Sequence, residues 1–339
     1  MVTPQPPDGK EAPPLRVVYF GTPSFAVPAL DRLLSSRHGV VAVVTQPDRP
    51  RGRGHHVTAG PVKALAESHG LPVLQPEKIK APALLDSLRA CAPDLGVVAA
   101  YGRILPDELL ALPRLGFVNI HASLLPRYRG ASPIQRAVIN GERSTGVSIM
   151  RVVRELDAGP VFESQPHPIG PDDTSLDVER ALAALGADTL LGVVDALSRG
   201  NAVETPQDHD RATYAAKLTR EDGRLDWNET AERLHNRVRG VHPWPHAYTF
   251  LSGGRYVIHR TTLRLNVEPS ALKAASSPPG TILLAHGADL IVAAGQSSAL
   301  GILEIQPENK RLMAVRDFLA GHPLRAGNRF EDNPPQPPQ

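Results

Sequence analysis

The sequence predicts an α/β protein in which a doubly wound, mostly parallel domain precedes a small β-barrel domain. In residues 16–200, short apolar runs alternate with segments of helical spacing, the pattern of a parallel sheet covered by helices on both faces. Beyond residue 212 the pattern changes to short strands about 8–12 residues apart, which is typical of a small barrel. The length of 339 residues agrees, because a domain commonly takes roughly 150 residues.

The elements of the first domain follow in order along the chain. Residues 16–20 form an apolar run that ends at Gly21-Thr22-Pro23, which predicts a buried strand and a turn. Residues 61–69 begin with proline, which a helix accepts at its first position. Thr174, with Asp177 three residues later, predicts the capped start of a long helix that ends near residue 197. Further strands are expected at 40–45, 73–74, 95–100, 117–121, 144–153 and 161–169, and further helices at 25–34 and 83–90.

A polar stretch at 201–212 predicts a linker to a second domain at 213–330. Both ends of the chain are rich in proline, so disordered tails are expected at 1–15 and 331–339. Within the second domain the pattern predicts a helix at about 228–239. Five strands are expected there, at 255–259, 261–267, 280–284, 289–293 and 300–306.

Composition narrows the class of protein. Hydrophobic residues make up 41% of the chain and charged residues 21%, which excludes a disordered polyampholyte. No apolar run reaches the ~18 residues of a membrane span, and the N-terminus lacks the apolar core of a secretory signal. The single cysteine, Cys91, excludes a disulfide framework and a cysteine-clustered zinc site. We therefore expect a cytoplasmic protein that does not enter membranes.

Charge is distributed unevenly. The whole chain carries +2, but residues 211–330 hold 16 Lys and Arg against 10 Asp and Glu. Such an excess suits a polyanionic partner, most simply a nucleic acid. A solvated basic surface on a small domain explains it equally well, so charge alone leaves both interpretations open.

Candidate catalytic residues follow the strand at 117–121. Asn119 and His121 are two residues apart, so their side chains share one face at the strand end where open α/β sheets bind ligands. Asp157 lies in a turn after the next strand, so an amide, an imidazole and a carboxylate could meet there. Ordinary cap and turn roles remain the alternative. The chain lacks the GxGxxG, GxxxxGK[ST], GxSxG and HExxH motifs, which removes several common enzyme classes.

Two motifs in this region resemble those of a known family. Residues 119–126 read NIHASLLP and residues 156–160 read LDAGP, and together they resemble the signature of folate-dependent formyltransferases. A basic insertion at 45–54, TQPDRPRGRG, narrows the resemblance to the methionyl-tRNA formyltransferase family. The family's LDTGD has Ala158 and Pro160 here, which makes the hydrogen bonds of this loop an open question. Further similar segments are GTPSFA at 21–26, YGRILP at 101–106, RGASPIQ at 129–135, PWP at 243–245 and GNRF at 327–330.

The resemblance implies a Rossmann-like formyltransferase domain and an OB-like, tRNA-binding barrel. It implies transfer of a formyl group from 10-formyltetrahydrofolate to the α-amine of methionyl-initiator-tRNA, by direct amine attack through a tetrahedral oxyanion and without a metal. Asn119 and a protonated His121 would donate hydrogen bonds to the oxyanion. Asp157 would accept the proton of the amine and hold His121 in its useful state.

The resemblance also implies which residues bind the folate and the tRNA. The protein is expected to be a monomer. A loop with Arg49, Arg51 and Arg53 would enter the acceptor stem of the tRNA. Three alternatives to this function remain. They are another folate-dependent amine formyltransferase (acting on a sugar nucleotide or glycinamide ribonucleotide), a 10-formyltetrahydrofolate hydrolase and an RNA-binding protein without catalysis. The folate would contact Tyr101, Gly102, Ile104, Ser123, Leu124, Leu125 and Pro126, and the barrel would hold the tRNA backbone through Arg237, Arg239, Arg255 and Arg329.

Overall fold

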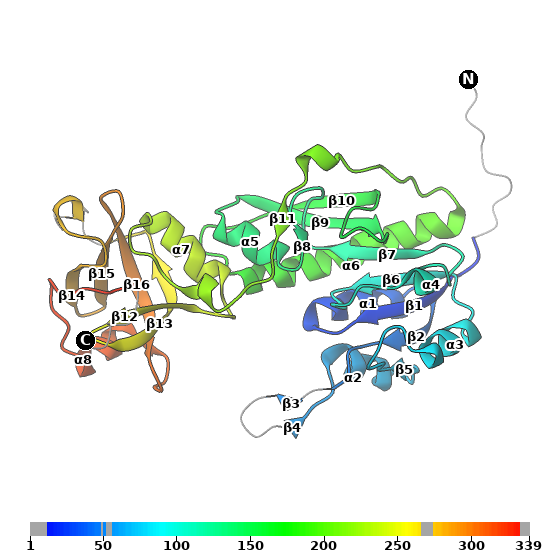
Figure 1. Ribbon diagram of the computed structural model, residues 1–339, viewed down its shortest axis with the longest axis horizontal. Helices are drawn as coiled ribbons and strands as arrows, with labels where there is room; N and C mark the ends of the chain where they lie inside the picture. Colours follow the sequence, from blue (N-terminus) through cyan, green and yellow to red (C-terminus); the bar gives the residue numbers. More distant parts are fainter. Residues whose placement is uncertain (1–11, 49, 52–55, 266–273, 333–339) are drawn as a thin grey trace. The chain divides into compact units, whose positions relative to one another are not determined.

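The computed structural model describes residues 12–48, 50–51, 56–265 and 274–332, and it separates into two compact units. Unit 1 combines the chain up to residue 129 with residues 146–167 and 180–213. Unit 2 takes residues 130–145 and 168–179 together with the chain from residue 214 onward. Figure 1 labels the elements of both units and colours them along the sequence.

Unit 1 is built on the predicted alternation of strands and helices. Its sheet contains β1 (Arg16–Gly21), β2 (Gly39–Val44), β5 (Val73–Leu74), β6 (Leu95–Ala99), β7 (Phe117–His121), β9 (Ser144–Arg151) and β10 (Val161–Pro168). Its helices are α1 (Val27–Leu34), α2 (Pro61–Ser68), α3 (Pro82–Ala90), α4 (Asp107–Leu110) and most of α6 (Ser175–Arg199). The short α4 and the two-residue strands β3 (Pro50–Arg51) and β4 (His56–Val57) are additions that the apolar pattern does not signal.

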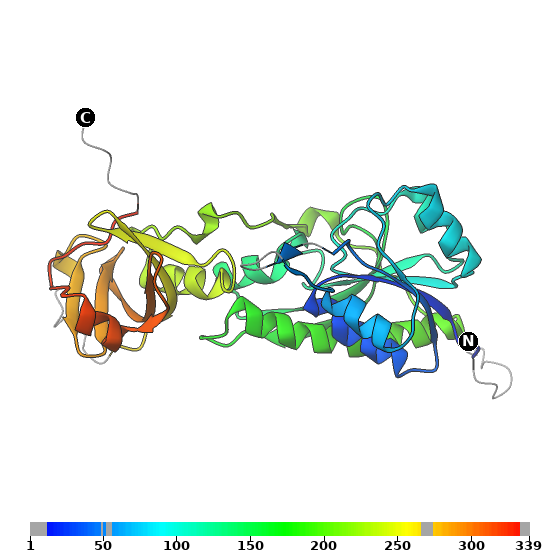
Figure 2. The same ribbon diagram turned by 90° about the horizontal axis from the view of Figure 1, so that it is seen from below.

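The sheet of unit 1 is mostly parallel, as predicted. Its strand order is β10-β9-β7-β6-β1-β2-β5. The pairs β7–β6, β6–β1, β1–β2 and β2–β5 are parallel, and β9 runs antiparallel to β7. Figure 2 shows α1 and α6 on one face of this sheet and α3 on the other. The doubly wound fold is therefore confirmed.

Close packing inside unit 1 depends on one glycine next to an aromatic ring. A Cβ on Gly96 would lie 2.1 Å from a ring carbon of Phe117, on the neighbouring strand. Phe117 is buried in the cluster that also contains Phe20 and Leu88. Because β7 carries Phe117 at its start and His121 at its end, this packing also holds the strand that carries the candidate site.

The long helix α6 begins where the sequence predicts its cap. The hydroxyl of Thr174 accepts from the N–H of Asp177 at 3.3 Å, and the Asp177 carboxylate accepts from the N–H of Thr174 at 3.0 Å. This reciprocal pair is a capping box. Among the described residues α6 alone has the length and composition of a membrane span, with a mean hydropathy of 1.5 over 18 residues; 44% of that window is buried inside the protein.

Unit 2 contains a second, antiparallel sheet. Its strand order is β12-β13-β16-β15-β14, with β17 paired to β16. The predicted strands at 255–259 and 261–267 are one strand, β13, whose register shifts around Arg260, as at a β-bulge. The elements are α5 (Pro133–Ile139), α7 (Ala231–Gly240), β12 (Ala247–Leu251), β13 (Gly254–Thr262), β14 (Ile282–His286), β15 (Asp289–Ala294), β16 (Ser298–Pro307), β17 (Met313–Ala314) and α8 (Val315–Gly321).

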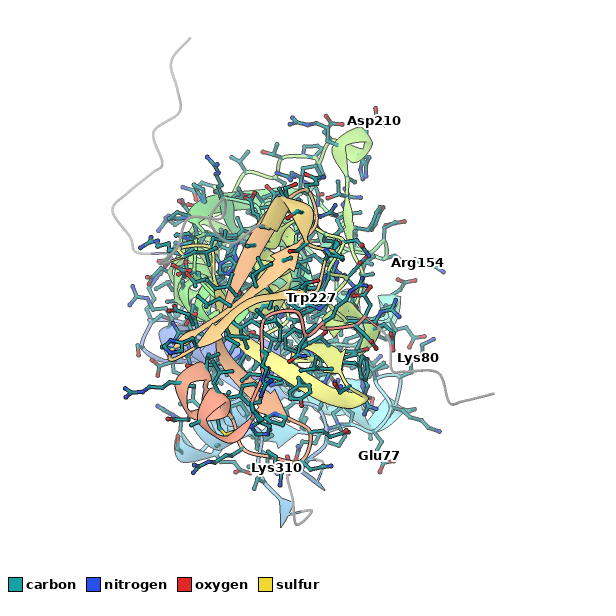
Figure 3. All side chains as sticks on the ribbon, turned by 90° about the vertical axis from the view of Figure 1, so that its left-hand side faces the viewer. Glu77, Lys80, Arg154, Asp210, Trp227 and Lys310 are labelled. Atoms are coloured by element: carbon teal, nitrogen blue, oxygen red, sulfur yellow. The ribbon has the colours of Figure 1, made fainter. Side chains whose placement is uncertain are left out.

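The two edges of this sheet are joined by residues 327–331. Glu331 pairs with Phe250 on β12, and Arg329 pairs with Thr281 beside β14. Residues 327–331 thus lie between the first and last strands and close the sheet into the predicted barrel. Trp227, labelled in Figure 3, is buried in its core, where its ring stacks on Phe330 with centroids 5.7 Å apart.

The packed chain extends beyond the boundaries expected from the sequence. Leu15, assigned above to the N-terminal tail, is buried, and its N–H donates to His38. At the other end, Asp332 accepts a hydrogen bond from the N–H of Trp227. Of the predicted tails at 1–15 and 331–339, residues 1–11 and 333–339 lie outside the described residues.

Candidate active site

The site begins at the carboxyl end of β7. Asn119 and His121 alternate with the buried Ile120, so both side chains lie on the opposite face of the sheet from Ile120. Asn119 is half-buried, and its side-chain amide makes no hydrogen bond within the described part of the chain. An amide that no protein group occupies retains both N–H donors for a ligand.

His121 is buried and held by a main-chain oxygen. Its Nε2 lies 2.9 Å from the carbonyl oxygen of Tyr128. A carbonyl only accepts hydrogen bonds, so Nε2 carries the proton and donates. The second nitrogen, Nδ1, then faces the carboxylate of Asp157, with 3.7 Å between Nδ1 and Oδ2. Strand β7 and the later turn therefore bring His121 and Asp157 together, as the spacing suggests.

Asp157 occupies an unusual backbone conformation. Its φ of +47° lies in the left-handed region, which aspartate tolerates better than most side chains. Two residues later, a Cβ on Gly159 would lie 2.0 Å from the carbonyl oxygen of Arg151, so this position requires glycine. The carbonyl of Pro160 accepts from the N–H of Arg151 at 2.8 Å. Proline serves here because the loop uses its oxygen and needs no N–H donor.

The Asp157 loop is also held by a residue that the sequence does not suggest. The side-chain amide of Gln207 donates to the carbonyl oxygens of Asp157 and Gly159, at 2.9 and 2.7 Å. The buried guanidinium of Arg129 donates to Oε1 of Gln207 from Nε and Nη2, at 3.1 and 2.7 Å. Gln207 lies in the stretch expected to be a linker. Gln207 is buried, and no local sequence pattern indicates this burial.

Residues 123–126 form a tight loop beside the strand end. The hydroxyl of Ser123 is buried and donates to the carbonyl of Arg127 at 2.6 Å, so it is used within the loop. Ser148 accepts from the N–H of Leu125 at 3.1 Å and donates to the carbonyl of Ser123 at 2.8 Å. The half-buried side chains at 124–126 remain for contact with a ligand.

Of the other residues expected to contact the folate, Tyr101 is buried, whereas Gly102 and Ile104 are exposed. Tyr101 is buried, and its ring packs edge-on against Phe20 at 5.2 Å between centroids. Its side chain therefore belongs to the core, and its main-chain carbonyl accepts from Gln46 at 3.0 Å. Gly102 is exposed with φ +78°, and Ile104 is 78% exposed. A large exposed apolar side chain is available here for a flat, apolar ligand.

The arginines predicted to contact the tRNA also include both buried and exposed side chains. Arg239 is 7% exposed, and its guanidinium donates to Asn236 and to the carbonyl of Asp173. Arg237 donates to both carboxylate oxygens of Glu229 at 3.1 and 3.2 Å. These two arginines are internal partners of the fold, because a residue facing a phosphate must be accessible.

The other predicted arginines are in different positions. Arg329 is exposed and donates from Nε to the carbonyl of Pro279. The guanidinium of Arg255 lies 4.2 Å from the ring centre of Tyr248. Arg49 and Arg53 lie outside the described residues, and Arg51 is described only as part of β3.

The base of the basic loop is well anchored. Lys63 donates to Asp48 Oδ2 at 2.5 Å and to Gln75 Oε1 at 2.9 Å. Gln75 donates in turn to Asp48 Oδ1 at 3.0 Å. The hydrogen bonds from Lys63 and Gln75 hold the pKa of the Asp48 carboxyl below its ordinary value. The chain therefore enters the loop from a fixed point.

Comparison with known proteins identifies two family models in the chain. The family model described as formyl transferase matches residues 15–194, and the model of the formyl transferase C-terminal domain matches residues 217–323. A methionyl-tRNA formyltransferase of Methylococcus capsulatus is 48% identical over 316 residues, which cover 93% of this chain and 99% of that protein.

Two solved structures share the fold. WlaRD, a sugar 3N-formyl transferase solved in the presence of dTDP and 5-N-formyl-THF, has a TM-score of 0.65 at 16% identity, over 88% of this chain and 99% of that one. HypX from Aquifex aeolicus, in complex with tetrahydrofolic acid, has a TM-score of 0.62 at 17% identity. The match covers 90% of this chain and 47% of HypX, so the chain spans about half the length of HypX.

Proposed function

Because this chain belongs to the formyl transferase family, we propose that it transfers a formyl group from 10-formyltetrahydrofolate to the α-amine of methionyl-initiator-tRNA. The observation that carries this proposal is the extent of the match. The relative from Methylococcus capsulatus is 48% identical over 93% of this chain. Both matched segments, 15–194 and 217–323, are present in one chain.

The side-chain amide of Asn119 is the proposed donor to the oxyanion. Attack of a neutral amine on the formyl carbon places negative charge on the former carbonyl oxygen. Asn119 is half-buried and has no hydrogen bond within the described residues that this role would have to replace. Loss of one such donor commonly lowers kcat by ~10²–10³-fold.

His121 and Asp157 are proposed to manage the proton. Since Nε2 of His121 is committed to the Tyr128 carbonyl at 2.9 Å, Nδ1 is the nitrogen left for chemistry. A protonated Nδ1 donates to the oxyanion, and the Asp157 carboxylate 3.7 Å away stabilises that positive charge. Asp157 also accepts the proton that the amine loses on attack, directly or through one water. When the tetrahedral intermediate collapses, the same protons are available to the departing nitrogen of the folate.

We propose that the folate lies against the apolar loop 124–126 and the exposed Ile104. These side chains are accessible, whereas the ring of Tyr101 and the hydroxyl of Ser123 are used inside the protein. The backbone of 101–102 is the further candidate, because pterin-like groups are well suited to main-chain hydrogen bonds. One chain carries Asn119, His121 and Asp157, so a monomer is sufficient for the reaction. Because the proposed acceptor is methionyl-initiator-tRNA, we propose that the protein acts in the cytoplasm.

Four arginines are proposed to bind the tRNA. The loop with Arg49, Arg51 and Arg53 supplies guanidinium groups suited to phosphates, and it begins at the fixed point formed by Asp48 and Lys63. On unit 2, Arg329 is exposed and remains in this proposal. Arg237 and Arg239 leave it because their guanidinium groups bind Glu229 and Asn236.

A formyl-transfer assay tests the function. The full chain is supplied with 10-formyltetrahydrofolate and with charged initiator Met-tRNA, charged elongator Met-tRNA or an amino sugar nucleotide. Rapid formylation of the initiator species alone supports the proposal. Transfer to the sugar amine, or release of formate without transfer, would replace it with one of the alternatives among folate enzymes. Absence of any turnover with intact folate binding would remove the catalytic proposal.

A further inference from the structure

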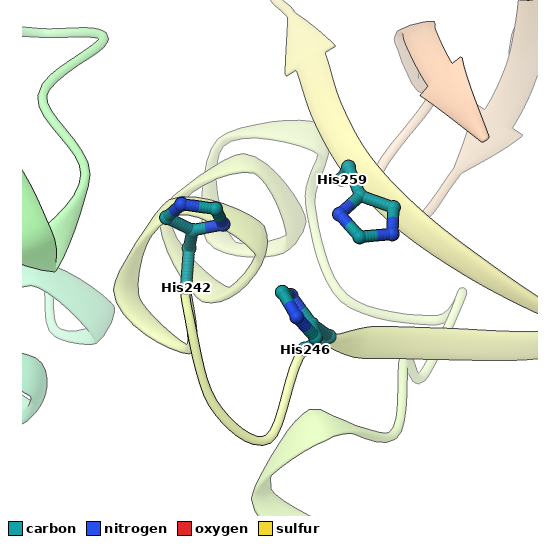
Figure 4. A group of neighbouring side chains, drawn as sticks. All are labelled: His242, His246 and His259. Atoms are coloured by element: carbon teal, nitrogen blue, oxygen red, sulfur yellow. The ribbon is translucent and has the colours of Figure 1, made fainter. Parts of the chain in front are cut away.

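Three histidines gather in unit 2, apart from the residues used above. His242 and His246 stand at the two ends of the turn Pro243-Trp244-Pro245, and His259 lies on β13. One ring nitrogen of each lies within 4.8 Å of the others. Figure 4 shows the three rings turned toward one shared space. Each ring is partly buried, so the cluster is neither fully exposed nor part of the apolar core.

The ring of His259 is fixed in a way that suits a metal ligand. Its Nε2 lies 2.9 Å from Oε1 of Gln306, an oxygen that accepts. Nε2 therefore carries the proton, and Nδ1 has a free lone pair. Histidines that bind metals are commonly oriented by such a hydrogen bond from the other ring nitrogen. Gln306 stands in that position for His259.

His246 is held in a backbone conformation that is uncommon for its residue type. Its φ is +67°, in the left-handed region. Residues other than glycine that keep such a conformation are found preferentially at ligand sites. Its ring centre lies 4.6 Å from that of His259 and 5.5 Å from that of His242, so it forms the middle of the cluster.

The crowding of the three rings affects the middle one, His246. Burial, followed by the effect of His259 and His242, lowers the pKa of His246 to about 4. The three imidazoles face one another around one space.

We propose that His242, His246 and His259 bind one divalent transition-metal ion of the Zn²⁺ class. Imidazole nitrogens are suitable ligands for zinc, and three of them with an open fourth position form a common zinc geometry. Tetrahedral zinc holds its nitrogens about 3.3 Å apart, so the rings must approach from within 4.8 Å by small side-chain rotations. The fourth position takes water.

The ion would join the turn after α7 to strand β13 within unit 2. His242 and His246 belong to the turn after α7, whereas His259 lies on the central part of β13. A bound ion cross-links this turn to the sheet. This role does not depend on the formyl-transfer proposal, because none of the three histidines takes part in it.

Zinc binding to the full chain, purified without a histidine tag and treated with a chelator, tests the proposal. Calorimetric titration with ZnCl₂ is expected to give one ion per chain, and thermal unfolding is expected to shift upward with the ion. Co²⁺ in place of zinc should give the intense visible absorption of a tetrahedral site. Zinc binding that does not saturate, or that saturates at more than one ion per chain, would contradict a single defined site.

Variants distinguish this cluster from other histidines. His259→Gln and His242→Gln should each abolish the stoichiometric ion, and either one suffices if the other fails to fold. Gln306→Leu should weaken zinc affinity about 10–100-fold while leaving all three ligands in place. His286→Gln, an exposed histidine on β14, is the control and should bind as the parent does. Unchanged affinity in both His259→Gln and His242→Gln would disprove the assignment, whatever the formyl-transfer assay gives.

Discussion

The side-chain amide of Gln207 donates a hydrogen bond of 2.9 Å to the main-chain oxygen of Asp157, which lies 50 residues earlier in the chain. The same amide nitrogen donates to Gly159, and Arg129 donates to the oxygen of this amide. Two interior side chains thus fix the loop that places the Asp157 carboxylate 3.7 Å from His121.

Gln207→Ala should therefore lower turnover without weakening substrate binding. The carboxylate loses its support, and a displacement of about 1 Å can cost roughly 100-fold in rate. We expect kcat to fall by roughly 10–100-fold, with the KM values for tRNA and folate nearly unchanged. Gln165→Ala is the matched control, because within the described part of the chain the side chain of Gln165 donates only to Glu163 on the same strand. A change confined to KM would show that Gln207 has no positioning role.

Asn119→Ala should reduce kcat more strongly. It removes the proposed oxyanion donor, so a loss of ~10²–10³-fold is expected. Folding should be unaffected, because the amide has no hydrogen bond within the described chain to lose. Single-turnover formylation with saturating tRNA measures the step, and tRNA affinity measured separately should match the parent. A loss below about threefold would be too small for an oxyanion donor.

The fold is largely readable from the sequence because its signals are local. The apolar runs around Val18 and Val97 can only be strands buried on both faces, and Thr174 with Asp177 marks the start of α6. The short α5 was not predicted, since Pro133–Ile139 spans about two turns and has too few residues to show a helical period. The sequence pattern divides the bulged β13 into two strands because polar Arg260 interrupts it.

The candidate site was only partly readable, for a physical reason. Asn119 and His121 are recognisable because the two-residue period of a strand places them on one face. Gln207 is not, because its role depends on a fold that returns a polar segment to the Asp157 loop. Arg239 misled for the opposite reason: sequence shows its charge, whereas burial determines that the charge serves Asn236 and Asp173.

His38 should make the protein sensitive to acid. Its Nδ1 accepts from the N–H of Leu15 at 3.0 Å, so protonating that nitrogen breaks the bond. Burial lowers the pKa of His38 below its ordinary value, and the unfolded chain consequently binds the proton more tightly than the folded one. The free energy of unfolding should thus decrease as pH falls below ~6.5.

Denaturant titrations between neutral and mildly acidic pH measure this dependence. His38→Gln should lose stability at neutral pH but show a smaller decrease on acidification than the parent. His69→Gln, an exposed histidine in the same unit, should keep the parent slope. Equal slopes for the parent and His38→Gln would assign the acid sensitivity to other groups.

Arg239→Met and Arg329→Met should have opposite effects. Arg239 is 7% exposed, and its removal leaves buried acceptors without partners, which costs about 1–3 kcal/mol of unfolding free energy. Arg329 is exposed, so its removal should change stability by at most about 0.5 kcal/mol. If it contacts a phosphate, the slope of log affinity for tRNA against log salt should become shallower by about one. Denaturation and salt-dependent tRNA binding provide the two readouts.

Replacing Arg49, Arg51 and Arg53 by alanine should raise KM for initiator tRNA and reduce the preference over elongator tRNA. The guanidinium groups are lost, while the loop base formed by Asp48 and Lys63 remains. Lys78→Ala with Lys80→Ala removes exposed charge elsewhere on unit 1 and serves as the control. An unchanged ratio of initiator to elongator formylation would separate the loop from substrate selection.

The strand-like segment at 327–331 also sets the moment at which unit 2 can be completed. Phe330 donates to Gly280 and Glu331 pairs with Phe250, so the last described residues join the first and last strands of the barrel. In a nascent chain, Phe250 on β12 and Thr281 beside β14 lack these partners until residues 327–331 have been synthesised. A chain that stops before residue 327 would leave backbone groups of both strands unpaired, which invites aggregation. Completion of the barrel therefore depends on a segment that follows all of its strands in the sequence.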